Sequence, residues 1–133
     1  MTTTYFLNNI MGNVFGSKKS PSLPTRYYIG LSTSAPDIDG GSVTEPSSSA
    51  GYERVELTTL GAPEDGIITN TLAISFEESL SDWGIVTHFV IYDAPTNGNL
   101  LMYDALTSPR TVEPATIVTI KDRSLTLTLA NPA

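Results

Sequence analysis

His88 is the chain's only histidine and the first side chain to consider for catalysis or metal binding. A zinc site would need carboxylates as its other protein ligands, because the chain has no cysteine and no second histidine. A catalytic base would need a partnered nucleophile, and the sequence contains no GxSxG nucleophile elbow. His88 also lies inside the apolar run GIVTHFVIYDA at residues 84–94. We therefore predict a neutral, hydrogen-bonded structural histidine in or beside the core.

Acidic side chains near the chain's only tryptophan are the second candidate for chemistry. Glu77, Glu78 and Asp82 precede Trp83. A glycosidase needs two carboxylates that face each other across a sugar-binding cleft, commonly with several exposed aromatic side chains. A single tryptophan at the start of a strand is more typical of a core or corner residue. We therefore predict that the protein is not an enzyme, that Trp83 is buried, and that the two glutamates form a solvated turn.

The sequence DIDGG at residues 37–41 is similar to part of a calcium loop. It lacks the distal bidentate glutamate of an EF-hand, and Glu45 follows too closely to take that position. Glu64 and Asp65 form a weaker acidic pair, and no phosphate-binding loop is present. We expect no cofactor and no metal, and calcium bound between loops is left as an open alternative.

The composition is typical of one acidic, β-rich domain. The 133 residues suffice for one core, charged residues make up only 16%, and threonine, serine, glycine and proline are abundant. The formal net charge of −7 disfavours binding to nucleic acid or anionic membranes. No stretch approaches the roughly 20 apolar residues of a membrane-spanning helix, and the N-terminus does not resemble a signal peptide. We therefore expect folding in a cytoplasm.

The N-terminal segment is the one good helix candidate. Threonines at 2–4 can cap it, Gly16 can end it, and its large apolar side chains recur at helical spacing. Two interpretations stay open: the helix packs on its own domain, or it is an arm that docks on a neighbouring subunit. The side chains that we expect to carry such docking are Phe6, Leu7, Ile10, Met11, Val14 and Phe15.

The rest of the chain alternates short β-type runs with turn-rich segments. The run at 84–94 is apolar on both faces, which predicts a central strand with Ile85 beside Phe89 on one face and Val86 beside Val90 on the other. We expect residues 61–70 to be a connection and the SPR sequence at 108–110 to end a strand. The expected strands are 25–33, 52–60, 71–76, 84–94, 100–107, 115–121 and 124–130.

These elements predict a mainly β fold: a single antiparallel β-sandwich, or a barrel-like domain, with one N-terminal α-helix. We place an N-terminal helical arm and connector at residues 1–20 and the β-sandwich domain at residues 21–133. Two segments stand out as candidate surfaces. They are the long polar loop at 34–51 and the hairpin at 93–99, where Asn97-Gly98 is a strong turn signal.

Several segments in combination resemble a family of small tailed-bacteriophage proteins usually labelled tail fibre proteins. The matching segments include YYIGLSTSAP, GYERVEL, DWGIVTHFVIYDAPTNGNLLMYDALTSPRTV and the closing SLTLTL, and together they cover nearly the whole chain. The resemblance implies a non-enzymatic virion component, made in the host cytoplasm, that associates with other virion proteins and with copies of itself. Its position could be the tail, the baseplate or, as a decoration, the capsid.

Two functions follow from this interpretation. In the first, the β-domain is a structural subunit that assembles through its N-terminal helix and sheet surfaces, and deleting residues 1–16 should leave a folded domain that no longer assembles. In the second, the loop at 34–51 and the hairpin at 93–99 bind a glycan or protein on the host surface. Receptor-binding surfaces commonly expose aromatic side chains, and Tyr52 is the chief candidate outside the strands.

Overall fold

The computed structural model describes residues 1–16 and 22–130. The predicted division after residue 20, much of the connector and the chain's last three residues lie outside these ranges. Within these ranges, one helix, α1 (Thr4–Val14), comes first and is followed by eight strands and one short 3-10 turn, η1 (Ser48–Ala50). The strands are β1 (Tyr28–Ser32), β2 (Val55–Glu56), β3 (Ile67–Thr69), β4 (Ile74–Ser75), β5 (Gly84–Tyr92), β6 (Leu100–Val112), β7 (Thr119–Ile120) and β8 (Thr126–Thr128).

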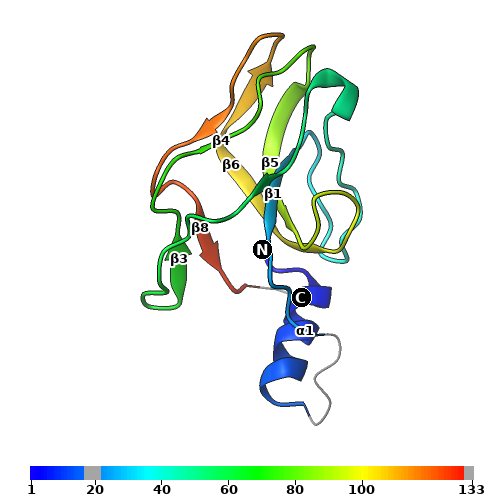
Figure 1. The fold of residues 1–133 in the computed structure, drawn as a ribbon. Helices are drawn as coiled ribbons and strands as arrows, with labels where there is room; N and C mark the ends of the chain where they lie inside the picture. The colour runs from blue at the N-terminus through cyan, green and yellow to red at the C-terminus, as the bar shows by residue number, and fades with distance from the viewer. Residues whose placement is uncertain (17–21, 131–133) are drawn as a thin grey trace.

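The largest sheet has four strands in the order β2-β1-β5-β6, and every neighbouring pair is antiparallel. β5 lies between β1 and β6, as the two-sided apolar pattern predicted. Two antiparallel two-stranded sheets, β3–β8 and β4–β7, lie beside it (Figure 1). The predicted mainly β, antiparallel fold with one N-terminal helix is confirmed. The barrel-like alternative is wrong, because the large sheet is open at β2 and β6 in the part of the chain that the structure describes.

The main hydrophobic core joins the large sheet to both smaller sheets. It contains side chains from β1 and β5 together with residues of β4 and of the segments beside β7 and β8. Trp83 is 4% exposed, donates its indole N–H to the Ala50 carbonyl at 2.9 Å and packs edge-to-face on Tyr52. Other fully or nearly buried members are Ile29, Leu31, Phe76, Val86, Leu101, Val112, Val118 and Leu125.

The β5–β6 ladder differs from the prediction in two ways. β6 does not end at the SPR sequence but continues to Val112, and the ladder skips residues 106–109 before Arg110 pairs with Val86. Proline has no N–H to donate, so Pro109 is tolerated in this irregular part of the strand. The shift in register also turns Val86 into the main core, where it lies with Phe89, and leaves Ile85 54% exposed. The prediction that Ile85 shares a face with Phe89 and Val86 shares one with Val90 is therefore wrong.

β3 lies within a segment that we expected to be a connection. Ile67–Thr69 consists of β-branched residues, but it is only three residues long and follows Gly66, so it is too short to stand out as a strand, and its partner β8 is far away along the chain. Asn70, which follows β3, is fully buried and satisfied: its amide donates to the carbonyls of Leu72 and Lys121, and its carbonyl accepts from Leu125 N–H. This buried amide fixes the smaller sheets relative to each other.

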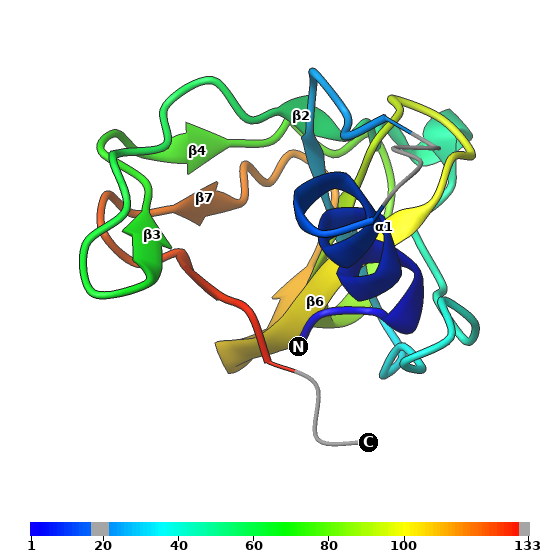
Figure 2. The same ribbon diagram turned by 90° about the horizontal axis from the view of Figure 1, so that it is seen from below.

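The N-terminal residues are bound firmly to the β-domain before the helix begins. Thr2 forms a bridge with Met102, and its N–H donates to the Ala130 carbonyl at 2.7 Å. Thr3 is the N-cap, and its hydroxyl accepts from Phe6 N–H while it donates to the Leu100 carbonyl. From this fixed base α1 projects beyond the end of the large sheet (Figures 1 and 2).

Candidate functional site

His88 is a half-buried residue of β5, with Ser32 and Ala105 opposite it on the two neighbouring strands. Its Nδ1 lies 2.8 Å from the Thr87 hydroxyl oxygen. The predicted position beside the core, with a hydrogen bond, is confirmed. In residues 1–16 and 22–130 no three acidic or histidine side chains come together in a group that could hold a metal ion.

The acidic candidates are spread over the surface. Glu77, Glu78 and Asp82 are all exposed, while the tryptophan beside them is buried in the core. Asp37 accepts a hydrogen bond from the Ser42 hydroxyl, and Asp39 accepts one from Gly41 N–H at 3.0 Å. These carboxylates of the 37–41 loop therefore hold the loop in its own turn.

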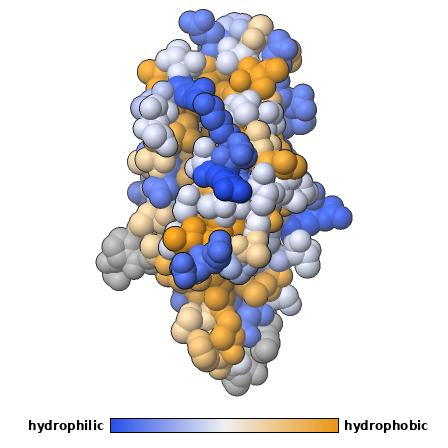
Figure 3. Space-filling view, turned by 90° about the vertical axis from the view of Figure 1, so that its left-hand side faces the viewer, coloured by the Kyte–Doolittle hydropathy of each residue, from blue (hydrophilic) through white to orange (hydrophobic). Residues whose placement is uncertain are grey.

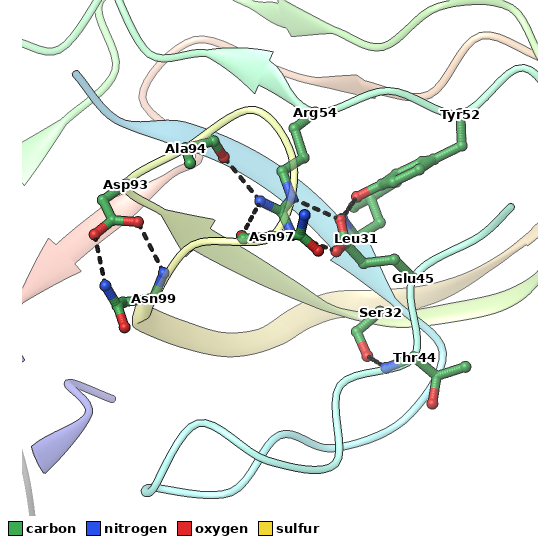
Figure 4. A network of polar contacts seen from close by, with 10 residues as sticks. All are labelled: Leu31, Ser32, Thr44, Glu45, Tyr52, Arg54, Asp93, Ala94, Asn97 and Asn99. Carbon is green, nitrogen blue, oxygen red and sulfur yellow. Dashed lines mark hydrogen bonds and ion pairs between the residues drawn. The ribbon is translucent and has the colours of Figure 1, made fainter. Parts of the chain in front are cut away.

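A buried ion pair connects the two segments that the sequence marked as candidate surfaces (Figure 4). The Arg54 side chain is 6% exposed and forms a two-pronged pair with Glu45, with Nη2–Oε1 at 2.6 Å and Nε–Oε2 at 3.0 Å. Its Nη1 donates to the carbonyls of Ala94 and Asn97, both at 2.8 Å. One guanidinium thus ties the 34–51 loop to the 93–99 hairpin, and the planar fork of arginine suits this role better than lysine would.

Two tyrosines complete what we call the Arg54 cluster, which consists of Glu45, Tyr52, Arg54 and Tyr92. The Arg54 guanidinium lies 3.6 Å from the centre of the Tyr92 ring, in cation–π geometry. The Tyr52 hydroxyl donates to Glu45 and accepts from Leu31 N–H at 2.9 Å. Burial, together with the bond to Glu45, raises the pKa of Tyr52. The charged groups of Glu45 and Arg54 and the Tyr52 hydroxyl thus bind one another or the backbone.

Gly30 makes this close packing possible. A Cβ atom at this position in β1 would lie 2.3 Å from the Tyr52 hydroxyl oxygen and 2.9 Å from Oε2 of Glu45. Only a residue without a side chain can sit beneath the cluster. Tyr52 itself is 6% exposed, so the expectation that it would be an exposed aromatic on a receptor-binding surface is wrong.

The sequence did carry a weak signal for this cluster. Tyr52, Arg54 and Glu56 alternate with Val55 and Leu57, so they share the face opposite to the apolar pair. An arginine beside a tyrosine at this spacing, in a chain with only seven basic residues, is a candidate for a buried pair. Its acidic partner comes from a long loop, and no local pattern indicates which glutamate it is.

The six predicted docking side chains divide into two groups along α1. Phe6 is 8% exposed and Ile10 is half-buried, and both pack on the main core. Leu7 is half-buried at the side of the helix. The remaining three side chains form the helix tip, and their exposed fractions are 53% for Met11, 57% for Val14 and 77% for Phe15.

Two of the three tip side chains are exposed because the helix turns them away from the body. Successive residues of an α-helix are about 100° apart, so Phe6 and Ile10 share one side while Met11 and Phe15 point to another. Val14 lies on the side of Ile10 but one turn further along the helix, and it is exposed there. No residue of α1 carries a charge. Figure 3 shows the lower end of the molecule, where α1 projects in Figure 1, largely in the hydrophobic colours.

An apolar groove lies between the base of α1 and the β3–β8 sheet. Its volume is about 440 Å³, and none of its lining residues is charged. Ile10 forms the helix side, Ile68 and Leu127 form the sheet side, and Leu129 is 55% exposed at its edge. The helix tip and this groove are thus two uncharged apolar surfaces in a chain with 14 acidic side chains.

Residues 1–128 match the protein family described as Podophage GP4 fiber I protein gp80. The chain belongs to this family. The match extends from the N-terminal residues through the end of β8, so it includes α1, the Arg54 cluster and all of the apolar groove except Leu129. No curated protein matches the chain.

Membership of this fibre family confirms the resemblance seen in the sequence and places the protein in the virion. The family consists of structural proteins of the phage fibre, and members associate with other virion components. Within the described residues, α1 is too short and insufficiently apolar to cross a membrane.

Proposed function

We propose that this fibre-family protein is a non-enzymatic structural subunit that assembles with copies of itself and with neighbouring virion proteins through its N-terminal helix and sheet surfaces. The observation that carries the proposal is the helix tip. Met11, Val14 and Phe15 project from a base that is fixed by Thr2 and Thr3, so the exposed apolar surface is held in one orientation.

Exposed apolar side chains that adjoin one another on a rigid element are typical of protein–protein contacts. Preorganisation lowers the entropic cost of docking, since α1 is already capped and attached. Because α1 carries no charged residue, a contact made through this helix brings no carboxylates of the acidic subunits together.

Incorporation into virions tests this proposal. Phage that carry the double substitution Val14→Asp and Phe15→Asp are compared with phage that carry Leu80→Asp. Leu80 is also an exposed apolar side chain, 74% accessible, but lies beside η1, the teal turn at the upper right of Figure 1. We expect mass spectrometry of purified particles to find less of the double variant and a normal amount of Leu80→Asp. Equal incorporation of both variants would contradict the proposal.

The location within the particle is part of the same proposal. The family description names a fibre, which supports a position on the tail rather than a capsid decoration. Electron microscopy of virions labelled with antibodies against this protein separates the two. Label at the tail or baseplate supports a fibre subunit, and label spread over the capsid supports a decorating subunit.

A host-surface binding function is the second candidate, and the Arg54 cluster favours it. Because Arg54 fixes the 34–51 loop to the 93–99 hairpin, the two loops present one rigid surface, and a hollow of about 410 Å³ lies between them. The burial of Tyr52 weighs against it, since the surface loses its chief aromatic anchor. Saturable binding of the pure protein on a glycan array or to host cells would support this function, and its absence would leave the structural subunit.

A further inference from the structure

We propose that the helix tip of one copy, formed by Met11, Val14 and Phe15, docks in the apolar groove of a second copy. This inference rests on the proposed function, because it specifies how copies of the chain meet. The two surfaces of this contact, the helix tip and the apolar groove, are different parts of the molecule. If two copies make the contact reciprocally about a two-fold axis, the interface is isologous. If each copy docks on the next, the contact is heterologous and builds a ring, or a filament where the rotation does not close.

Charge favours a second copy of this chain as the occupant of the groove. Two copies, each with a formal net charge of −7, repel one another, and the repulsion at the contact is smallest where they meet through uncharged surfaces. None of the chain's acidic side chains lies on α1 or lines the groove. The helix tip and the groove are thus surfaces through which copies can approach without burying a carboxylate.

Size and chemistry also match. An apolar cavity of about 150 Å³ holds one benzene molecule. The groove, at about 440 Å³, therefore has room for the Phe15 ring and a neighbouring aliphatic side chain. Its walls include Leu60, Pro63 and Leu127, which offer aliphatic contacts, and its open side gives access from solvent.

The fold prevents the helix tip from filling the groove of its own chain. The base of α1 is itself one wall of the groove, because Phe6 and Ile10 line it. Met11 and Phe15 lie on a different side of the same helix, and Val14 lies one turn beyond Ile10, so none of the three lines the groove. An apolar tip that cannot reach its own groove can reach that of a neighbour.

Cross-linking tests the arrangement, and the absence of native cysteine makes single labels possible. Two full-length variants, Val14→Cys and Leu129→Cys, are mixed and treated with a short bismaleimide; both positions are more than half exposed, so both variants should fold. We expect a cross-linked product that joins the two different variants. The matched control mixes Val14→Cys with Leu80→Cys and should give little product.

The possible results separate this inference from the function on which it rests. A product that joins only Val14→Cys to itself would show that helices pair with helices, which overturns the groove while leaving assembly intact. Oligomers in sedimentation without any cross-link would overturn the groove in the same way. A wild-type protein that is monomeric at every concentration, together with no cross-linked product from the mixed cysteine variants, would overturn both the groove and self-assembly.

Discussion

The Arg54 cluster and the helix tip use the same chain in opposite ways. In the cluster, a buried cation and a carboxylate bind each other, the Tyr52 hydroxyl and two loop carbonyls, and the cation also lies over the Tyr92 ring. At the helix tip, three large apolar side chains stand exposed on a helix whose base is fully attached. One region uses its polar groups to fix loops, and the other leaves large apolar side chains more than half exposed.

The difference separates residues that stabilise the single chain from residues that are available for contacts between molecules. Substitutions in the Arg54 cluster or at the base of α1 should lower the free energy of unfolding of the single chain. Substitutions at the helix tip should leave that free energy nearly unchanged and act only on contacts between molecules. Matched pairs of substitutions can test this distinction, because the chain offers similar residues in both settings.

The largest loss of stability is expected for Arg54→Ala. It leaves Glu45 partly buried without its partner and removes the bonds to two loop carbonyls, so the free energy of unfolding should fall by about 4 kcal/mol. Urea unfolding followed by tryptophan fluorescence measures the change. Arg26→Ala is the control, since Arg26 is exposed and lies 4.0 Å from Glu56, and it should cost about 0–1 kcal/mol. Similar losses in the two variants would contradict the role of the cluster.

Phe6→Ala and Phe15→Ala compare two phenylalanines on one helix. Phe6 is 8% exposed and packs against the core, so its truncation should cost about 3 kcal/mol. Phe15 is 77% exposed, and its truncation should change stability by less than about 0.5 kcal/mol. Thermal unfolding of both variants at low protein concentration measures the difference, and a large loss for Phe15→Ala would mean that the tip already has a partner within the chain.

The same comparison can be made with two glycines. Gly30→Ala places a methyl group against Tyr52 and should destabilise the protein by about 2 kcal/mol, through overpacking. Gly12→Ala lies in α1 with no atom within 4 Å of the new Cβ, and it should stabilise the helix by up to about 1 kcal/mol. Opposite shifts of the urea midpoint are expected. A neutral Gly30→Ala would show that the cluster can move aside.

The smallest effect concerns alkaline pH. Burial raises the pKa of Tyr52 in the folded protein above the value near 10 of an unfolded chain. Below pH 10 the hydroxyl is protonated in both states, and its contribution to stability is fully present. Above pH 10 the unfolded state loses this proton while the folded state keeps it, so stability should fall. The fall should be less steep in Tyr52→Phe, as measured by urea midpoints from pH 9 to pH 11.

Local patterns in the sequence were enough to predict most of the fold. The helical spacing in α1, the two-sided apolar run in β5 and the Asn97-Gly98 turn are all encoded by near neighbours, and all three are present. β3 and the continuation of β6 past Pro109 were not predicted. Both depend on pairing with distant strands, which compensates for weak local signals.

The candidate site was predictable only in part for the same reason. The sequence identified the apolar residues of α1 but not which of them are buried and which are exposed, because the orientation of the helix depends on how Thr2 and Thr3 pair with the end of the domain.

The attachment of Thr2 and Thr3 also changes which experiment is most informative. Deleting residues 1–16 would remove Thr2, Thr3 and Phe6 from the core, so the deletion would combine a folding defect with an assembly defect, whereas substitutions at the tip separate the two.

Analytical ultracentrifugation of the wild-type protein and a Met11→Ser, Val14→Ser, Phe15→Ser variant tests whether the helix tip joins molecules while contributing little to the fold. We expect the wild type to form oligomers as its concentration rises, and the variant to stay monomeric with an unchanged urea midpoint. A variant that associates as strongly as the wild type, or one that unfolds at a clearly lower urea concentration, would contradict the account.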